Sequence, residues 1–354
     1  MMNRYWTLTE TPLGALPEPR NFRLQQAPLP RPGPGQALTR TIYVSLDPYQ
    51  WLYRKRGLEP PGSPCHARTV AQVIESRMPD YACGDLVFNT NGWVEYALMG
   101  EGVSRPAYMI PRRLDPAKGK ISYALGVLGM LGLTAYAGMI LQGDPRAGET
   151  VVVSAASGGV GQIAGQLARL RGAHIVGIAG RPEKQRYVVE ELGFDACVSH
   201  LSPTLPADLT AVTPGGVDVY FENVGGAVFD AVLPRLNRGA RMSLCGVIAH
   251  YGDDTGGDVK GAFIAGAGAA LAAAGVILHD LSVSDYVASH QDRFLIQMTD
   301  WVASGQVRYR EDIRHGLDNI LAVFGDMMRG DTFGKTLVQI APDPTVVGHA
   351  SHPS

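Results

Sequence analysis

Three closely spaced glycines are the residues of this chain best suited to bind a phosphate. Gly158, Gly159 and Gly161 lie in the segment Ala155-Ala-Ser-Gly-Gly-Val-Gly161. Such glycines let the backbone turn tightly and approach a pyrophosphate, while the free N–H groups of a following helix face the anion. The chemistry that they suggest is the binding of a dinucleotide cofactor.

The flanking sequence must support this interpretation, because a turn can need glycine for its geometry alone. Val151 to Val153 form a β-branched run typical of a strand buried on both faces, and residues 162–171 repeat apolar side chains at helical spacing. His174 to Ile178 then indicates a second strand. This strand–turn–helix–strand order favours a nucleotide site over a purely structural turn.

The sequence after the second strand predicts the phosphorylated form of the cofactor. A site selective for NAD carries an acid about 20 residues past the glycines, to bind the ribose 2′-hydroxyl. Here Ile178-Ala-Gly-Arg181 ends the strand and Lys184 follows, so cations stand where a 2′-phosphate would sit. We therefore predict NADP(H). The alternative is that Arg181 and Lys184 are solvated charges at the start of a helix.

Cysteine spacing argues against a structural metal or a disulfide framework. Cys65, Cys83, Cys197 and Cys245 lie far apart and form no C-x-x-C pair. We therefore expect no metal and a reducing, cytoplasmic location.

Composition describes an ordinary soluble protein. The 354 residues are enough for two domains, and a net charge of −2 leaves no basic excess for nucleic acid. The first residues lack the apolar core of a secretory signal, so we expect no export. Residues 261–278 are long and uncharged, but alanine and glycine dominate them, so we expect a close-packed helix running into a buried strand and no membrane.

The order of the expected elements gives the fold class. Up to about residue 100, short apolar runs alternate with Pro and Gly clusters, which predicts a β-rich domain. Residues 123–142 look helical, and after the glycine turn strands alternate with helices, the pattern of a parallel α/β sheet covered on both faces. Lys335 to Ile340 looks like a closing strand that returns to the first domain. The tail with His349 and His352 should be frayed.

Several segments together resemble one family, the zinc-independent medium-chain dehydrogenases/reductases, in the alkenal/one oxidoreductase branch that includes curcumin reductase and prostaglandin/leukotriene-type enone reductases. The resemblance spans nearly the whole chain. The matching segments are Leu46-Asp-Pro-Tyr49, Gly92-Trp-Val-Glu-Tyr96, Gly132-Leu-Thr-Ala-Tyr136, Ala147 to Ser157, Glu183-Lys184, Tyr220-Phe-Glu-Asn-Val-Gly-Gly226 and Phe333-Gly-Lys335.

The resemblance implies a GroES-like domain at residues 1–130 and 305–354, with a Rossmann domain at residues 131–304 inserted between them. It implies an active site in the cleft between the two domains. It also implies a homodimer.

The resemblance further implies which residues contact the cofactor. We expect this set to comprise Thr134, Gly158, Gly159, Val160, Gly161, Arg181, Lys184, His200, Asn223, Cys245, Leu281, Val283 and Thr332. Two alternatives stay open: Cys245 could contribute by packing alone, and Asn223 could be a turn residue.

The reaction implied is hydride transfer from NADPH to the β-carbon of an α,β-unsaturated ketone or aldehyde, followed by protonation of the enolate. Tyr251 matches the tyrosine nearest the substrate and could donate a hydrogen bond or the proton, or be a wall residue. Tyr49 and Trp93 match cleft positions that line the substrate, although scattered aromatics are also core residues.

Four departures from the family lie near the expected active site. They are the strand Asp280-Leu-Ser-Val283, Thr332 in place of Asn, His200 in place of Tyr, and the run Gln50-Trp-Leu-Tyr-Arg-Lys-Arg56. They favour a dedicated, biosynthetic substrate. A zinc-free quinone or carbonyl reductase and a non-catalytic NADPH-binding homologue remain alternatives.

Overall fold

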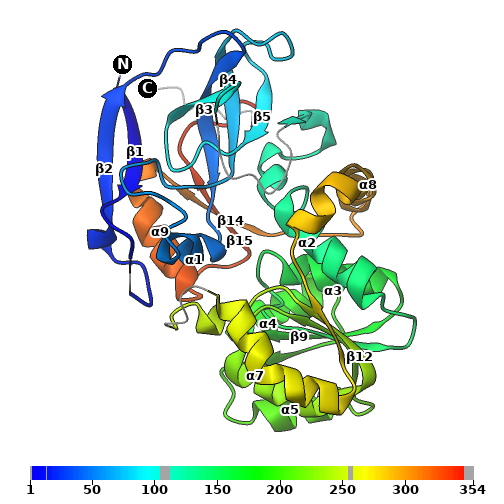
Figure 1. Ribbon diagram of the computed structural model, residues 1–354. Helices are drawn as coiled ribbons and strands as arrows, with labels where there is room; N and C mark the ends of the chain where they lie inside the picture. The colour runs from blue at the N-terminus through cyan, green and yellow to red at the C-terminus, as the bar shows by residue number, and fades with distance from the viewer. Residues whose placement is uncertain (1, 13, 104–111, 254–257, 347–354) are drawn as a thin grey trace, which may run out of the picture.

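The computed structural model describes residues 2–12, 14–103, 112–253 and 258–346, and it forms two lobes that each contain a sheet (Figure 1). In the described chain the N-terminal lobe holds a two-stranded sheet, β1-β2, and a larger sheet of order β14-β15-β3-β4-β5-β7 with β6 paired to β3. The nucleotide lobe holds a sheet of order β10-β9-β8-β11-β12-β13. The predicted tail with His349 and His352 lies outside the described residues.

The N-terminal lobe includes the strands β1 (Met2–Leu8), β2 (Phe22–Pro28), β3 (Gln36–Ser45), β4 (Thr69–Ser76), β5 (Leu86–Asn89), β6 (Tyr96–Gly100), β7 (Arg112–Arg113), β14 (Glu311–His315) and β15 (Lys335–Gln339). Its helices include η1 (Pro19–Asn21), α1 (Tyr49–Lys55), η2 (Pro116–Lys118), η3 (Ile121–Leu125), η8 (Leu317–Asn319) and α9 (Ile320–Met328).

The nucleotide lobe includes the strands β8 (Thr150–Val153), β9 (His174–Ala179), β10 (Ala196–Ser199), β11 (Val217–Glu222), β12 (Leu236–Leu244) and β13 (Ile277–Asp280). Its helices include α3 (Gly161–Leu170), α4 (Pro182–Arg186), η5 (Tyr187–Glu191), α5 (Leu205–Val212), α6 (Gly226–Val232), η6 (Leu233–Arg235), η7 (Ile248–His250) and α7 (Val259–Ala274). Between the lobes run α2 (Met130–Tyr136), η4 (Ala137–Gly143) and α8 (Ser284–Ala303).

The strand before the glycine turn is buried on both faces, as its sequence predicts. Val151 and Val153 pack in one core cluster with α3, and Val152 packs in the other with α5 and α6. All neighbouring strands of this sheet pair in parallel. Helices on both faces of a parallel sheet, joined to a β-rich lobe, confirm the predicted fold class.

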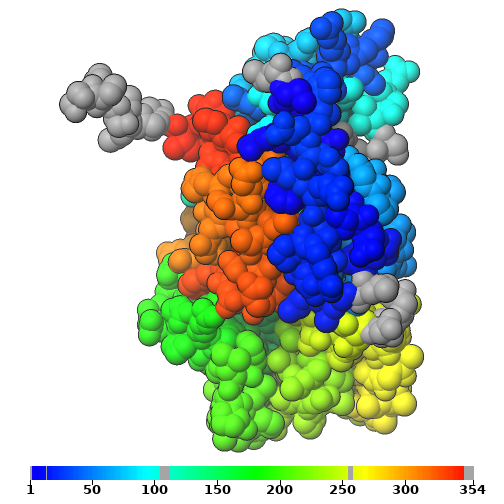
Figure 2. Space-filling model, turned by 90° about the vertical axis from the view of Figure 1, so that its left-hand side faces the viewer, coloured from blue at the N-terminus to red at the C-terminus, as the bar shows by residue number. Residues whose placement is uncertain are grey.

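The C-terminal part of the chain completes the N-terminal sheet. β15 pairs antiparallel with β3, bringing Leu337 opposite Ser45, and β14 pairs in parallel with β15. Figure 2 shows this orange and red segment packed beside the blue N-terminal residues, above the green and yellow nucleotide lobe. The predicted closing strand is therefore confirmed. We propose that the domain boundaries lie near residues 130 and 305, where the chain crosses between the lobes.

The predicted continuous helix over residues 123–142 is wrong. The chain instead forms η3, then α2 from Met130, and continues as the π-helical η4. Gly129 explains the interruption, because a Cβ at this position would lie 2.1 Å from the carbonyl oxygen of Ala124. Close backbone packing, which helical periodicity does not report, breaks the helix there.

The expected burial of residues 261–278 is also wrong. Within α7 only Val259 and Leu271 are buried, and Ile277 of β13 is 50% exposed. One cause is position, since β13 is the last strand of its sheet. Among the helices of the described residues, none has the length and hydropathy needed to span a bilayer.

A buried ionic cluster joins three distant segments at the boundary of the two lobes. Lys335 Nζ lies 2.8 Å from Asp47 Oδ1 and donates to the carbonyl oxygen of Leu46, and a guanidinium nitrogen of Arg68 lies 2.9 Å from Asp47 Oδ2. Burial works against the charged carboxyl, but Lys335 and Arg68 outweigh it and lower the pKa of Asp47 to about 2. The carboxylate is thus ionised whenever the protein is folded at neutral pH.

We expect Asp47→Asn to lower the free energy of unfolding by about 3–5 kcal/mol at pH 7, because two buried cations lose their counter-charge. Since the folded-state pKa is depressed, the contribution of Asp47 is present above its unfolded pKa near 4 and disappears as the pH falls toward 2. The difference between wild type and variant, measured by urea unfolding, should therefore shrink over that window.

The control is Asp326→Asn, which removes an exposed ion pair with Arg329 and should cost less than about 1 kcal/mol. An Asp47→Asn protein as stable as wild type at pH 7 would contradict the role of the cluster.

Candidate active site

A cleft of about 780 Å³ opens between the two lobes and is lined by both. It brings together most of the residues predicted from the sequence. Those that line it are Tyr49, Thr134, Gly158, Gly159, Val160, Gly161, Lys184, His200, Asn223, Cys245, Tyr251, Leu281, Val283 and Thr332. Their roles remain predictions, but they share one cavity. Arg181 and Trp93 do not line it.

The glycine turn lies at the carboxyl end of β8, where ligands bind in open parallel sheets. A Cβ on Gly161 would lie 2.3 Å from the carbonyl oxygen of Ala155, and one on Gly159 would lie 2.4 Å from the side chain of Leu131. Both positions therefore require glycine for close packing. Because the first turn of α3 faces the cleft, its backbone N–H groups are placed to bind an anion.

A buried hydrogen-bond network holds the next loop at the sheet edge. Asn223 donates from its backbone N–H to Ser154 Oγ and from its side-chain amide to the carbonyl oxygen of Ser154, both at 2.7 Å. Ser154 Oγ in turn donates to Glu222 Oε1 at 2.7 Å, and the Tyr220 hydroxyl donates to Glu222 Oε2 at 2.5 Å. Ser154 thus holds both the backbone and the side chain of Asn223, which is more than a simple turn residue needs.

Sequence reasoning missed Ser154 and Glu222 as members of the site. Burial raises the pKa of Glu222, which has no exposed surface. A carboxyl in such a place has to be satisfied by donors, and Ser154, Tyr220 and the N–H of Val224 supply them. The available signal was an acidic residue, Glu222, directly after the apolar run Val219-Tyr-Phe221 at the carboxyl end of the strand Val217–Glu222.

Lys184 and His200 form one end of the cleft. Lys184 Nζ donates to the carbonyl oxygen of Gly330 at 2.8 Å, and burial followed by repulsion from Arg181 lowers its pKa. Burial and the charge of Lys184 also lower the pKa of His200. Both lowered pKa values indicate that a bound anion would stabilise the charged forms of these two side chains.

Arg181 lies next to this region but outside the lining of the cleft. One of its guanidinium nitrogens lies 2.5 Å from Asp331 Oδ1, and the side chain is 53% exposed. Its contact with a phosphate remains a prediction, and in this structure Asp331, 150 residues away, engages the side chain.

Tyr251 also lines the cleft. It is 9% exposed, and within the described residues its hydroxyl has no hydrogen-bond partner. The hydroxyl lies over Gly246, where a Cβ would come within 3.0 Å of it. Burial raises its pKa, so the phenol is protonated and able to donate at neutral pH.

Cys245 lies beside Tyr251 as a protonated thiol. Burial raises the pKa of Cys245 to about 12. Because the thiolate is the reactive form, this environment favours a packing role over nucleophilic chemistry.

The two aromatic residues predicted to line the substrate site lie in different environments. Tyr49 lines the cleft, and its hydroxyl lies 3.1 Å from His66 Nε2. Trp93 is fully buried in the N-terminal core, with Phe324 at a ring-centroid distance of 5.3 Å and the guanidinium of Arg54 at 4.3 Å from its ring centroid. The prediction that Trp93 lines the substrate site is wrong, because its residue type suits a core as well as a cleft.

The departures from the family pattern do cluster at the cleft. Leu281 and Ser282 line it, and Lys260 donates to the carbonyl oxygen of Leu281 at 3.0 Å while pairing with Asp280. The Thr332 hydroxyl accepts a hydrogen bond from Thr336 at 2.9 Å. These side chains give the wall a polar rim above an apolar floor.

Known proteins resemble the chain over nearly its full length. Residues 4–105 match the model for the N-terminal domain of oxidoreductases, and residues 159–298 match that for zinc-binding dehydrogenases. NADPH-dependent curcumin reductase of Escherichia coli is 38% identical over 96% of this chain and 98% of its own length. The NADP⁺-dependent 2-alkenal reductase of Nicotiana tabacum is 34% identical over 87% and 88% of the two chains.

The solved structures include a closely similar fold. CurA of Vibrio vulnificus in complex with NADPH superimposes with a TM-score of 0.85 at 36% identity, covering 96% of this chain and all of that one. The chain belongs to the medium-chain dehydrogenase/reductase family, in the branch of the curcumin and alkenal reductases. This confirms the resemblance seen in the sequence.

The chain is an NADPH-dependent oxidoreductase of this type, and the prediction of NADP(H) is confirmed. The cleft fits this cofactor, because the glycine turn and the start of α3 would hold the pyrophosphate and Lys184 and His200 would hold the 2′-phosphate. Although one family model is named for zinc-binding enzymes, no group of three or more His, Cys, Asp or Glu side chains in the described chain could hold a metal.

We expect Lys184→Ala to raise the KM for NADPH by about tenfold and to leave the KM for NADH nearly unchanged, because only NADPH carries the 2′-phosphate. Arg181→Ala is the matched comparison. Because Arg181 is already paired with Asp331, we expect this substitution to raise the KM for NADPH less than Lys184→Ala does. Steady-state kinetics with both cofactors measure the ratio, and equal losses with NADH and NADPH would refute a phosphate-binding role for Lys184.

Proposed function

We propose that the protein reduces the C=C bond of an α,β-unsaturated ketone or aldehyde. The cofactor, when bound, supplies the hydride to the β-carbon, and a proton then adds to the α-carbon of the enolate. The observation that carries this proposal is the presence, in one cleft, of a dinucleotide-binding turn and of Tyr251, a buried residue whose hydroxyl has no hydrogen-bond partner among the described residues. The activities named for the two curated relatives support it.

Tyr251 supplies what the developing oxyanion needs. A neutral phenol in a desolvated site donates a hydrogen bond that strengthens as negative charge builds on the carbonyl oxygen. The same hydroxyl, directly or through water, can pass a proton to the α-carbon. Tyr49 and the side chains of Leu52 and Val283 offer apolar surface to a planar enone.

Two other activities from the sequence are less well supported. A quinone or carbonyl reductase would use the same cofactor, but two relatives that match at above 30% identity over most of the chain are named as a curcumin reductase and a 2-alkenal reductase. A non-catalytic NADPH-binding protein would not need a buried hydroxyl facing the cleft. The departures at Ser282 and Thr332 support a dedicated substrate over a broad range.

The test is NADPH oxidation with a panel of enones, enals, quinones and acyl thioesters, with products identified by mass. We expect enones and enals to gain two hydrogens at the C=C bond. In Tyr251→Phe, kcat should fall roughly a hundredfold, because an oxyanion donor is lost, while NADPH affinity stays unchanged.

Leu52→Ile, which alters the lining of the same cleft without removing a polar group, is the control and should keep kcat within a few-fold. Full kcat in Tyr251→Phe would remove the donor role. Turnover of quinones alone would replace the enone assignment, and NADPH binding without any turnover would favour the non-catalytic alternative.

We also propose that the protein is a homodimer in a reducing, cytoplasmic environment. The exposed edge of β13, with Ile277 50% exposed, supports self-association because an unpaired strand edge can extend a sheet into a second copy. All four cysteines are free, which supports a reducing compartment.

Light scattering should give twice the 37.8 kDa mass of one chain. Ile277→Lys should shift the protein toward monomer, because a charge would be buried at the joined edge. Ile296→Lys on α8, a position that is 67% exposed, should leave the mass unchanged. A wild-type monomer, or equal effects of the two substitutions, would exclude dimerisation through β13.

A further inference from the structure

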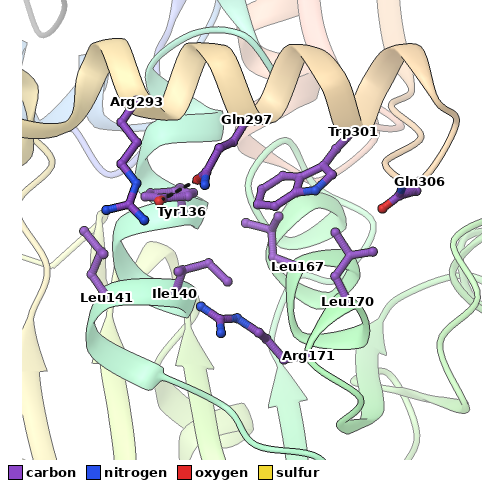
Figure 3. Close-up of a pocket in the computed structure, with 10 residues that line it drawn as sticks. All are labelled: Tyr136, Ile140, Leu141, Leu167, Leu170, Arg171, Arg293, Gln297, Trp301 and Gln306. Carbon is purple, nitrogen blue, oxygen red and sulfur yellow. Dashed lines mark hydrogen bonds between the residues drawn. The ribbon is translucent and has the colours of Figure 1, made fainter.

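A second cavity of about 460 Å³ lies on the other side of α2, beneath α8 (Figure 3). It is separate from the active-site cleft. Thr134 of α2 lines the cleft, whereas Tyr136, two residues further along, lines this cavity. Nothing in the proposed reaction requires it.

The floor and one side of this cavity are apolar. Ile140 and Leu141 come from η4, Leu167 and Leu170 from α3, and the Trp301 ring descends from α8 toward the two leucines of α3. Leu141 is 36% exposed, and Leu170 and Trp301 are half-buried. Water therefore covers apolar surface here that a ligand chain could replace.

Two cations reach the same space from different helices. Arg293 extends down from α8 toward Leu141, and Arg171 extends from the end of α3 toward Ile140 (Figure 3). Neither guanidinium has an ion pair or hydrogen bond to the described part of the chain, and no acidic side chain contributes to the lining. The negative end of the α3 dipole favours a cation at Arg171. It does not explain the second cation, Arg293, which comes from α8.

One polar group beside the cations is already oriented. The Tyr136 hydroxyl donates to Gln297 Oε1 at 2.8 Å, which turns the amide nitrogen of Gln297 away as an available donor. The cavity thus combines donors and positive charge at one end with leucine and tryptophan side chains at the other.

We propose that this cavity binds an amphipathic carboxylate, with the carboxylate between Arg171 and Arg293 and the chain along Leu167, Leu170 and Trp301. Guanidinium groups match a carboxylate in charge and in donor geometry. The volume suits a chain of medium length, since ligand cavities of about 300–1,000 Å³ hold small organic molecules.

Isothermal titration calorimetry of the full-length protein saturated with NADPH tests this, with octanoate, 1-octanol and acetate as probes. Octanoate should bind at one site. 1-Octanol, which lacks the carboxylate, and acetate, which lacks the long alkyl chain, should each bind at least about tenfold more weakly. Raising the salt concentration should weaken octanoate binding, since the two guanidinium groups are exposed.

The double variant Arg171→Gln/Arg293→Gln should lose at least about tenfold in octanoate affinity and keep its weak binding of 1-octanol. Each single variant should show part of the loss, which keeps the test open if the double variant folds poorly. Arg31→Gln, an exposed arginine of the N-terminal lobe, is the matched control and should behave as wild type. Circular dichroism and NADPH binding check the fold of each variant.

Three binding results would overturn the proposal, and one kinetic result would do the same. These are no octanoate binding at millimolar concentration, equal binding of octanoate and 1-octanol, and undiminished binding in the double variant. Competitive inhibition against an enone would also overturn it, because it would place octanoate in the active-site cleft.

Discussion

The buried carboxylate of Asp47 is the constraint on which the shape of the active site depends. An ionised group in the protein interior must be paired, and Asp47 is paired by Arg68 and by Lys335, which come from distant parts of the chain. Leu46 and Asp47 precede Tyr49 in the cleft wall, and Lys335 follows the segment with Thr332. One ionic cluster therefore fixes the positions of the C-terminal strand, the substrate wall and part of the cofactor wall relative to one another.

The opposite wall is organised by hydrogen bonds to one buried carboxyl group. Glu222 has no exposed surface and a raised pKa, and it organises Ser154 and Asn223 at the carboxyl edge of the parallel sheet. Backbone groups, glycines and short polar side chains dominate this wall, which allows close approach of a flat cofactor. The rigid cofactor wall and the aromatic substrate wall thus arise from different sheets and different interactions.

Local sequence patterns predicted the parts of this arrangement that depend on local physics. The β-branched run before Gly158 predicted the buried strand β8, and the missing acid after Ile178 predicted the phosphorylated cofactor. The last apolar run, Lys335 to Ile340, predicted β15. The errors come from contacts distant in sequence. Trp93, for example, packs on Phe324 and Arg54 in the core instead of lining the cleft. Periodicity carries no information about such partners.

The burial of Tyr251 narrows what its hydroxyl can contribute. A raised pKa means that the phenolate is disfavoured, so full release of the proton would leave a charge in a desolvated pocket beside the neutral Cys245 thiol. Donation of a hydrogen bond to the enolate oxygen avoids that charge, whereas transfer to carbon requires immediate replacement of the proton. The raised pKa therefore supports the proposed role of Tyr251 as an oxyanion donor better than a role as the source of the final proton.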